Sequence, residues 1–246
     1  LFNKSEESWE DFEVHAIPAF LFKYRKPVRR FIAHSLALIR MSLPRFFRNH
    51  LDRILMYDHG PTTDIVRIGE GCLGNCSYCA IRFSRGRLRS KPLEQILDEV
   101  RVLADKGADE ILFTATETAS WGRDLGKNLA ELMLELLALP YSFRILLFYA
   151  NPRWLIDSWD QLEPLFSTGR FHFVHLSLNG GSDAVLKSMR RAYSLSQFEK
   201  LVRDIKRVSP QTVLQTQVIT GYPGENTIEF LTTIRFFLRN YFHNVQ

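Results

Sequence analysis

From Asp64 to the end of the chain, short apolar runs alternate with longer stretches in which apolar residues recur every three or four positions. The short runs are typical of buried strands, and the longer stretches are typical of amphipathic helices. The strand-like runs are Asp64–Ile68, Glu110–Thr114, Arg144–Tyr149, His172–Leu178 and Val213–Ile219. Strands that alternate with helices in this way predict right-handed βαβ units and a parallel sheet.

The first helix-like stretch has the clearest boundaries, with Ser90 and Pro92 as start signals and Gly107 as a stop signal. The apolar faces of the four stretches are centred on residues 93–104, 129–137, 198–205 and 230–238. Sheets of this kind carry their functional sites at the C-terminal ends of the strands. After the last helix, residues 241–246 stand where a sixth strand would begin, so we expect a core over 64–246 that breaks off at that strand.

Residues 1–63 differ in composition from the rest and predict a short, mostly helical N-terminal arm or partial domain. Residues 1–13 are acidic, whereas Lys23 to Arg53 holds nine Lys and Arg against one acid. Pro18, Pro27 and Pro44 divide this segment into short helical pieces. The basic residues are interleaved with aromatic ones, which suits contact with RNA and equally suits a solvated helical face.

Several broad classes are disfavoured by the sequence. The longest uncharged run near the N-terminus, residues 31–39, is far shorter than the roughly 20 apolar residues that span a bilayer. The chain opens on acidic residues and not on a secretory signal. Its three Cys lie within eight residues, which argues against a disulfide framework. We therefore expect a cytoplasmic protein without a membrane partner, whose net charge of +5 either favours an anionic partner or simply maintains solubility.

The three Cys follow the first strand directly, in the loop GEGCLGNCSYC that runs from Gly69 to Cys79. Thiolates spaced C-x3-C-x2-C can each take a different iron of a 4Fe–4S cubane, which leaves the fourth iron open to a small molecule. A zinc site would need a fourth ligand, and the nearest upstream His, His59, lies across a strand. A Cys76–Cys79 redox pair would leave Cys72 unexplained.

The stretch GEGCLGNCSYCAIRFSRGRLRSKP, Gly69 to Pro92, resembles the radical S-adenosylmethionine (SAM) superfamily and, more narrowly, its methylthiotransferases. The similarity continues through TATETASWG (114–122), Asn151-Pro152-Arg153, LNGGSDAVL (178–186) and VITGYPGE (218–225), and so covers roughly residues 64–246. Within that family, the CLGNC loop is most like the branch that modifies threonylcarbamoyladenosine beside the tRNA anticodon.

This resemblance implies a partial parallel (β/α) barrel of the radical SAM type, within the α/β class. It implies a 4Fe–4S cluster on Cys72, Cys76 and Cys79, with SAM as the second cofactor. Cleavage of SAM to a 5′-deoxyadenosyl radical would then serve methylthiolation of the tRNA adenosine next to the anticodon. The implied partners are tRNA and an electron donor, flavodoxin-like or equivalent, while the oligomeric state is left open.

Carried over residue by residue, the resemblance implies a SAM site made of Tyr78, Thr116, Glu117, Asn179, Ser182, Gly221 and Glu225. Tyr78 and the segment from Gly221 to Glu225 would flank the adenine. Thr116 and Glu117 would meet the amino group or ribose, and Asn179 and Ser182 would line the polar end. Both glutamates could instead be solvated loop carboxylates. Basic side chains that follow the loop would contact substrate phosphates or simply surround a helix start; they are Arg82, Arg85, Arg87 and Arg89.

The sequence departs from the family pattern in several places. Methylthiotransferases bind a second cluster through three Cys of an N-terminal domain, and residues 1–63 contain no Cys. The C-terminal RNA-binding barrel is not found either. Asn179-Gly180-Gly181 stands where the family favours Gln-Ser-Gly, and Gln217 where it favours Asp. Two alternatives thus remain beside methylthiolation: a radical SAM enzyme with another outcome, and a non-catalytic, cluster-bearing remnant that binds RNA or a partner.

Overall fold

The computed structural model describes residues 64–240 and 242–246. The predicted helical arm over residues 1–63 lies outside this described part. The chain divides into two units at the boundary between Pro61 and Thr62, and the described residues all belong to the second unit.

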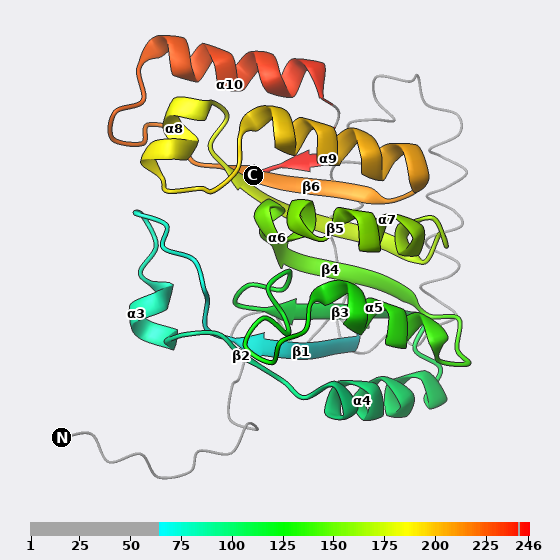
Figure 1. The fold of residues 1–246 in the computed structure, drawn as a ribbon. Coiled ribbons are helices and arrows are strands. Elements are labelled where there is room, and N and C mark those ends of the chain that lie inside the picture. The colour runs from blue at the N-terminus through cyan, green and yellow to red at the C-terminus, as the bar shows by residue number, and fades with distance from the viewer. Residues whose placement is uncertain (1–63, 241) are drawn as a thin grey trace, which may run out of the picture. The chain divides into compact units, whose positions relative to one another are not determined.

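A single sheet of seven strands forms the centre of the described part (Figure 1). The strands are β1 (Asp64–Glu70), β2 (Arg89–Ser90), β3 (Glu110–Ala115), β4 (Arg144–Ala150), β5 (Phe171–Asn179), β6 (Val213–Val218) and β7 (Asn244–Val245). Their order is β2-β1-β3-β4-β5-β6-β7, and every pair except β1–β2 is parallel. The five predicted strands and the parallel α/β class are confirmed, and β7 lies where a sixth parallel strand was expected.

The connections between strands are helical. They comprise α3 (Ile81–Arg85), α4 (Leu93–Asp105), α5 (Leu129–Ala138), α6 (Pro152–Asp157), α7 (Trp159–Phe166), α8 (Asp183–Ser188), α9 (Leu195–Val208) and α10 (Thr227–Arg239). The helices predicted from periodicity are α4, α5, α9 and α10. Within the described residues, no helix combines the length and apolar character that crossing a membrane would need.

The core lies between the sheet and the helices that cover one of its faces (Figure 1). Val66, Phe113, Leu147 and Val174 are fully buried there from four neighbouring strands. The alternate residues Leu112, Leu146 and Phe173 form a smaller apolar cluster of their own. Because successive residues of a strand point to opposite faces, apolar residues on both faces give the nearly continuous apolar runs seen in the sequence.

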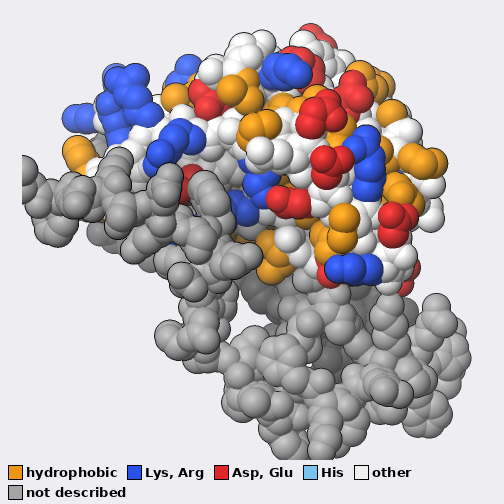
Figure 2. Space-filling view, turned by 90° about the horizontal axis from the view of Figure 1, so that it is seen from below, with side chains coloured by type: hydrophobic (Ala, Val, Ile, Leu, Met, Phe, Trp, Pro, Cys, Tyr) orange, Lys and Arg blue, Asp and Glu red, His pale blue; other side chains and the backbone are white. Residues whose placement is uncertain are grey.

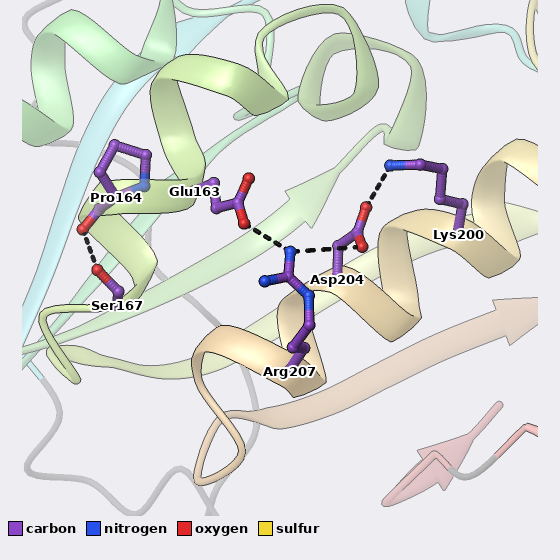
Figure 3. Close-up of polar contacts among 6 residues, drawn as sticks. All are labelled: Glu163, Pro164, Ser167, Lys200, Asp204 and Arg207. Carbon is purple, nitrogen blue, oxygen red and sulfur yellow. Dashed lines mark hydrogen bonds and ion pairs between the residues drawn. The ribbon is translucent and has the colours of Figure 1, made fainter.

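Helix α9 is held against α7 by its apolar face and by one ion pair at the surface, while two further pairs lie within α9 itself (Figure 3). Arg207 pairs with Glu163 of α7 at 2.5 Å and with Asp204 at 3.7 Å, and Lys200 pairs with Asp204 at 2.6 Å. Such exposed pairs contribute at most about 1 kcal/mol each, so the buried face of α9 provides most of the stability.

Candidate functional site

The cysteine loop leaves β1 at its C-terminal end and returns along β2. Pairing of Gly69 with Ser90 closes the base of the loop, and the Cys72 amide donates to the Gly86 carbonyl at 3.3 Å. Gly71 has φ of 73°, and a Cβ there would lie 2.1 Å from the carbonyl oxygen of Arg87. Only glycine therefore allows the two arms of the loop to approach so closely.

All three thiols are free and half-buried on this loop. The Gly74 amide donates to Cys72 Sγ at 3.1 Å, and a Cβ at Gly74 would lie 3.2 Å from Cys72 Sγ and 3.7 Å from Cys76 Sγ. The missing side chain thus leaves room beside the two sulfurs, and the Gly74 backbone amide donates a hydrogen bond to one of them. Burial raises the pKa of the Cys72 thiol to about 11, so an iron that binds this sulfur has to displace its proton.

In the described part of the chain, no three His, Cys, Asp or Glu side chains form a group suited to one metal ion. The donor set that the loop offers consists of three thiols, which is the ligand type of cubane clusters. Three thiols, a glycine cradle and an amide donor to sulfur fit a 4Fe–4S cluster. His59, the ligand in the zinc alternative, lies outside the described residues.

The tip of the loop contacts the segments that follow β5 and β6. The Ser77 amide donates to the Met189 carbonyl at 3.3 Å, and Ser77 Oγ donates to the Ser188 carbonyl at 2.9 Å. Ser77 Oγ also shares a hydrogen bond of 2.7 Å with the Tyr222 hydroxyl. The chain segments beyond three different strands therefore meet at the C-terminal ends of the strands.

Tyr78 and Asn179, both predicted from the resemblance, lie in direct contact. Asn179 Nδ2 donates to the Tyr78 hydroxyl, and Gln217 Nε2 donates to Asn179 Oδ1 at 2.9 Å. Asn179 has φ of 68°, in the left-handed region that Asn tolerates better than most residues. Gln217 thus supports Asn179, and two positions at which the sequence departs from the family pattern form one hydrogen-bonded unit.

Glu117 is buried, so it is not a solvated loop carboxylate. Its Oε1 accepts hydrogen bonds from the amides of Ala119 at 2.9 Å and Asn151 at 3.0 Å. Burial nevertheless raises the pKa of this carboxyl to about 7. The side chain is therefore held rigidly after β3 and exchanges a proton near neutral pH.

This raised pKa predicts a pH-dependent stability. Glu117 ionises near pH 4.5 in the unfolded chain and near pH 7 in the folded chain. The protonated side chain therefore contributes fully to the free energy of unfolding below pH 4.5, and this contribution is lost as the pH rises through 7. The free energy of unfolding that is lost over this pH range is on the order of 3 kcal/mol. Glu117→Gln should remove this loss, as measured by urea unfolding between pH 4.5 and 8. Glu135→Gln, at an exposed position on α5, is the control. If the free energy of unfolding changes with pH in the same way in wild type and Glu117→Gln, the pH-dependent loss does not come from Glu117.

The remaining predicted residues are largely engaged within the protein. Ser182 is buried and caps α8, because its Oγ accepts from the Val185 amide at 3.2 Å. The Gly221 amide donates to Glu225 Oε2 at 2.5 Å, whereas Glu225 Oε1 is buried without a hydrogen-bond partner. Thr116 is half-buried just after β3. Gly221 and Glu225 are therefore brought together, while the Ser182 hydroxyl serves a helix.

Arg191 was missed by the sequence reasoning. It follows α8 and is 9% exposed, and its Nη1 donates to Cys76 Sγ at 3.4 Å. Its Nη2 donates to the Ser177 carbonyl and its Nε to the Tyr193 hydroxyl. In the sequence, Arg190-Arg191 looks like an ordinary basic surface pair, and only the tertiary structure separates the exposed residue from the buried one.

His175 was also missed. It is buried on β5, its Nδ1 accepts from the Tyr149 amide at 3.3 Å, and its Nε2 has no hydrogen-bond partner. Burial lowers the pKa of His175 to about 4, so the ring is neutral near pH 7. Gln215 stands in register with it on β6 and has a buried, unpartnered Oε1. Two unsatisfied polar atoms are thus found on neighbouring residues of the sheet.

Lys and Arg side chains gather at the left edge of the described surface in Figure 2, the side on which α3 lies in Figure 1. Arg82, Arg87 and Arg89 are exposed in this segment. Arg82 donates to Asn75 Oδ1 at 3.3 Å, and Arg85 pairs with Glu70 at 3.2 Å. The segment after the cysteine loop therefore presents positive charge next to the site.

The family model of the radical SAM superfamily matches residues 66–237. A probable threonylcarbamoyladenosine tRNA methylthiotransferase of Pyrococcus abyssi is 33% identical over 202 residues, which is 81% of this chain and 48% of that protein. A probable enzyme of the same name from Methanocaldococcus jannaschii is 37% identical over 68% of the chain and 39% of that protein. The human threonylcarbamoyladenosine tRNA methylthiotransferase is 29% identical over 80% of the chain and 32% of that protein.

The chain thus spans less than half the length of these relatives. Among solved structures, the radical SAM methyltransferase TsrM of Kitasatospora setae, with cobalamin and a [4Fe-4S] cluster bound, matches with a TM-score of 0.60 at 17% identity. That match covers 72% of this chain and 34% of the methyltransferase. The cobalamin-dependent SAM radical enzyme OxsB matches with a TM-score of 0.56 at 12% identity, over 71% and 26%. At these identities the likeness concerns the fold.

Proposed function

The chain belongs to the radical SAM superfamily, and from that premise we propose that it binds a 4Fe–4S cluster through Cys72, Cys76 and Cys79 and cleaves SAM. The observation that carries the proposal is the cysteine loop, with its three free thiols, the amide of Gly74 on Cys72 Sγ and the room that Gly74 leaves beside two sulfurs. Its position at the C-terminal end of a parallel strand is the usual place for such a site.

Cys72, Cys76 and Cys79 would hold the cluster, which would supply the electron for SAM cleavage and an open iron for the amino and carboxylate groups of SAM. The residues of the chain position the rest of SAM. Tyr78, fixed by Asn179, offers a ring for the adenine. Two amides hold Glu117 Oε1 and so fix the carboxyl group, which would meet the amino group or a ribose hydroxyl of SAM. The turn from Gly221 to Glu225 flanks the same region, because Tyr222 contacts Ser77.

The proposed substrate is tRNA, and the proposed reaction is that named for the relatives, methylthiolation of threonylcarbamoyladenosine. The sequence identity supports this substrate, and so does the positive charge over α3, because phosphate contacts supply much of the affinity for nucleic acids. The flavodoxin-like electron donor and the cytoplasmic location stay predictions. The proposed core spans residues 64–246, with Cys72, Cys76 and Cys79 as cluster ligands. The residues proposed to surround SAM are Tyr78, Thr116, Glu117, Asn179, Ser182, Gly221 and Glu225.

A radical SAM enzyme with a different outcome is the second candidate. Every Cys of the chain lies in the cysteine loop, so none remains to hold a second, sulfur-donating cluster. We therefore expect this chain, acting alone, to cleave SAM and to add no methylthio group to tRNA.

Mass spectrometry of nucleosides from tRNA that has been incubated anaerobically with the reconstituted chain, SAM and a strong reductant tests this expectation. Unmodified threonylcarbamoyladenosine together with released 5′-deoxyadenosine is the expected result. A mass gain that matches a methylthio group would show that this chain needs no second cluster. Release of no 5′-deoxyadenosine from a protein with a full cluster would favour the non-catalytic alternative.

A further inference from the structure

Arg191 is a buried cation in contact with the cysteine loop. The residue is 9% exposed, and its guanidinium donates to Cys76 Sγ at 3.4 Å. It lies between α8 and α9, 115 positions from that sulfur in the sequence, so the fold and not the local chain brings the two together. The contact is therefore a product of the parallel sheet, in which the segments beyond β5 and β1 meet at one edge.

The other hydrogen-bond partners of this guanidinium are uncharged, namely the carbonyl of Ser177 and the hydroxyl of Tyr193. Among the ion pairs of the described residues, none joins Arg191 to a carboxylate. Its charge lowers the pKa of Glu117 through space, without a hydrogen bond between the two. Because an unpaired buried charge costs several kcal/mol, a buried Arg calls for an anion nearby. Among the groups that the guanidinium touches, Cys76 Sγ is the one that carries negative charge as a cluster ligand.

The guanidinium is also held in place. Tyr193 is 8% exposed, and its hydroxyl accepts from Arg191 Nε at 3.2 Å and donates to the Leu178 carbonyl at 2.8 Å. The plane of the guanidinium is therefore fixed from two sides before any ligand binds. A charge fixed in this way stabilises an anion without reorganisation.

We propose that Arg191 is a positioning residue that pairs with the Cys76 thiolate and favours the reduced state of the cluster on the cysteine loop. This inference rests on the proposed function, because it requires the cluster to be present. Reduction adds one electron, which the reductant supplies, and makes or breaks no bond. A fixed positive charge beside a ligand sulfur stabilises the added negative charge and so raises the reduction potential.

The test is a potentiometric titration of the reconstituted cluster, followed by electron paramagnetic resonance in the absence of SAM. Arg191→Met removes the charge and keeps a side chain of similar length. We expect the ratio of reduced to oxidised cluster at a given potential to fall at least tenfold, which is a midpoint about 59 mV lower for one electron. Arg191→Lys keeps the charge, so its midpoint should lie closer to that of the wild type than the midpoint of Arg191→Met does.

Arg190→Met is the matched control, because it makes the same change one residue away at an exposed position. Its midpoint should equal that of the wild type. Near-ultraviolet circular dichroism establishes whether each variant is folded. If Arg191→Met does not fold, Arg191→Gln takes its place.

If the cluster assembles and its midpoint potential in Arg191→Met equals that of the wild type and of Arg190→Met, the role of Arg191 is overturned and the proposed function is left intact. A wild-type chain that takes up no cluster would overturn both.

Discussion

Single replacement of Cys72, Cys76 or Cys79 by Ala is expected to remove most of the iron that the wild-type chain binds, about four atoms per chain for one cubane. Each thiolate holds a different iron, and the chain contains no other Cys that could substitute. Iron analysis and visible absorption after anaerobic reconstitution measure the effect. Because each thiolate holds a different iron, the three variants should lose iron to a similar extent.

The control for these variants is Ser77→Ala, in the same loop. It removes the hydrogen bonds of Ser77 Oγ with Ser188 and Tyr222 and leaves the three thiols in place. Ser77→Ala should keep its iron. Three alanine variants with a full cluster, or wild-type protein that contains one zinc per chain, would contradict the assignment of the cysteines.

Gly71→Ala is expected to have the second large effect, on both stability and iron content. Its Cβ would lie 2.1 Å from the oxygen and 2.6 Å from the carbon of the Arg87 carbonyl group, and φ is 73°. Backbone atoms cannot move aside as the end of a side chain can. The two arms of the loop must therefore separate, with a loss of at least about 3 kcal/mol in the free energy of unfolding.

Gly107→Ala separates this clash from the cost of the left-handed conformation alone. Gly107 has φ of 83°, and a Cβ there would meet nothing within 4 Å. We expect a loss of about 1 kcal/mol and an unchanged cluster. Urea unfolding and iron analysis of both variants give the comparison. Equal effects at the two glycines would mean that the approach of Arg87 to Gly71 does not matter.

The regular part of the fold could be predicted from the sequence because its signals are local. Apolar runs indicated β1, β3, β4, β5 and β6 to within a few residues, and helical periodicity indicated α4, α5, α9 and α10. The connection between β4 and β5 shows why other elements escaped. It is split into α6 and α7 at Ser158, and Pro164 lies inside α7, so neither piece is long enough for a clear period. Strand β2 has two residues and exists through pairing with β1.

The site was only partly predictable, since much of it depends on tertiary contacts. Spacing alone singled out the three cysteines as candidate cluster ligands. The resemblance suggested Ser182 for SAM, and the structure adds that its hydroxyl accepts the capping hydrogen bond of α8. Gly181 was part of a matched motif, and the structure supplies its reason: a Cβ there would lie 2.4 Å from the Thr233 side chain on α10. Arg191 carried no signal, because one buried Arg beside a sulfur cannot be told from its exposed neighbour in a sequence.

We propose that the cluster on the cysteine loop of this chain cleaves SAM reductively. Quantification of 5′-deoxyadenosine, after anaerobic incubation of the reconstituted chain with SAM and a strong reductant, tests it most directly. We expect release by the wild type and by Ser77→Ala, and none by Cys76→Ala. The same amount of 5′-deoxyadenosine from Cys76→Ala as from the wild type, or none from a wild type that carries four irons, would contradict the claim.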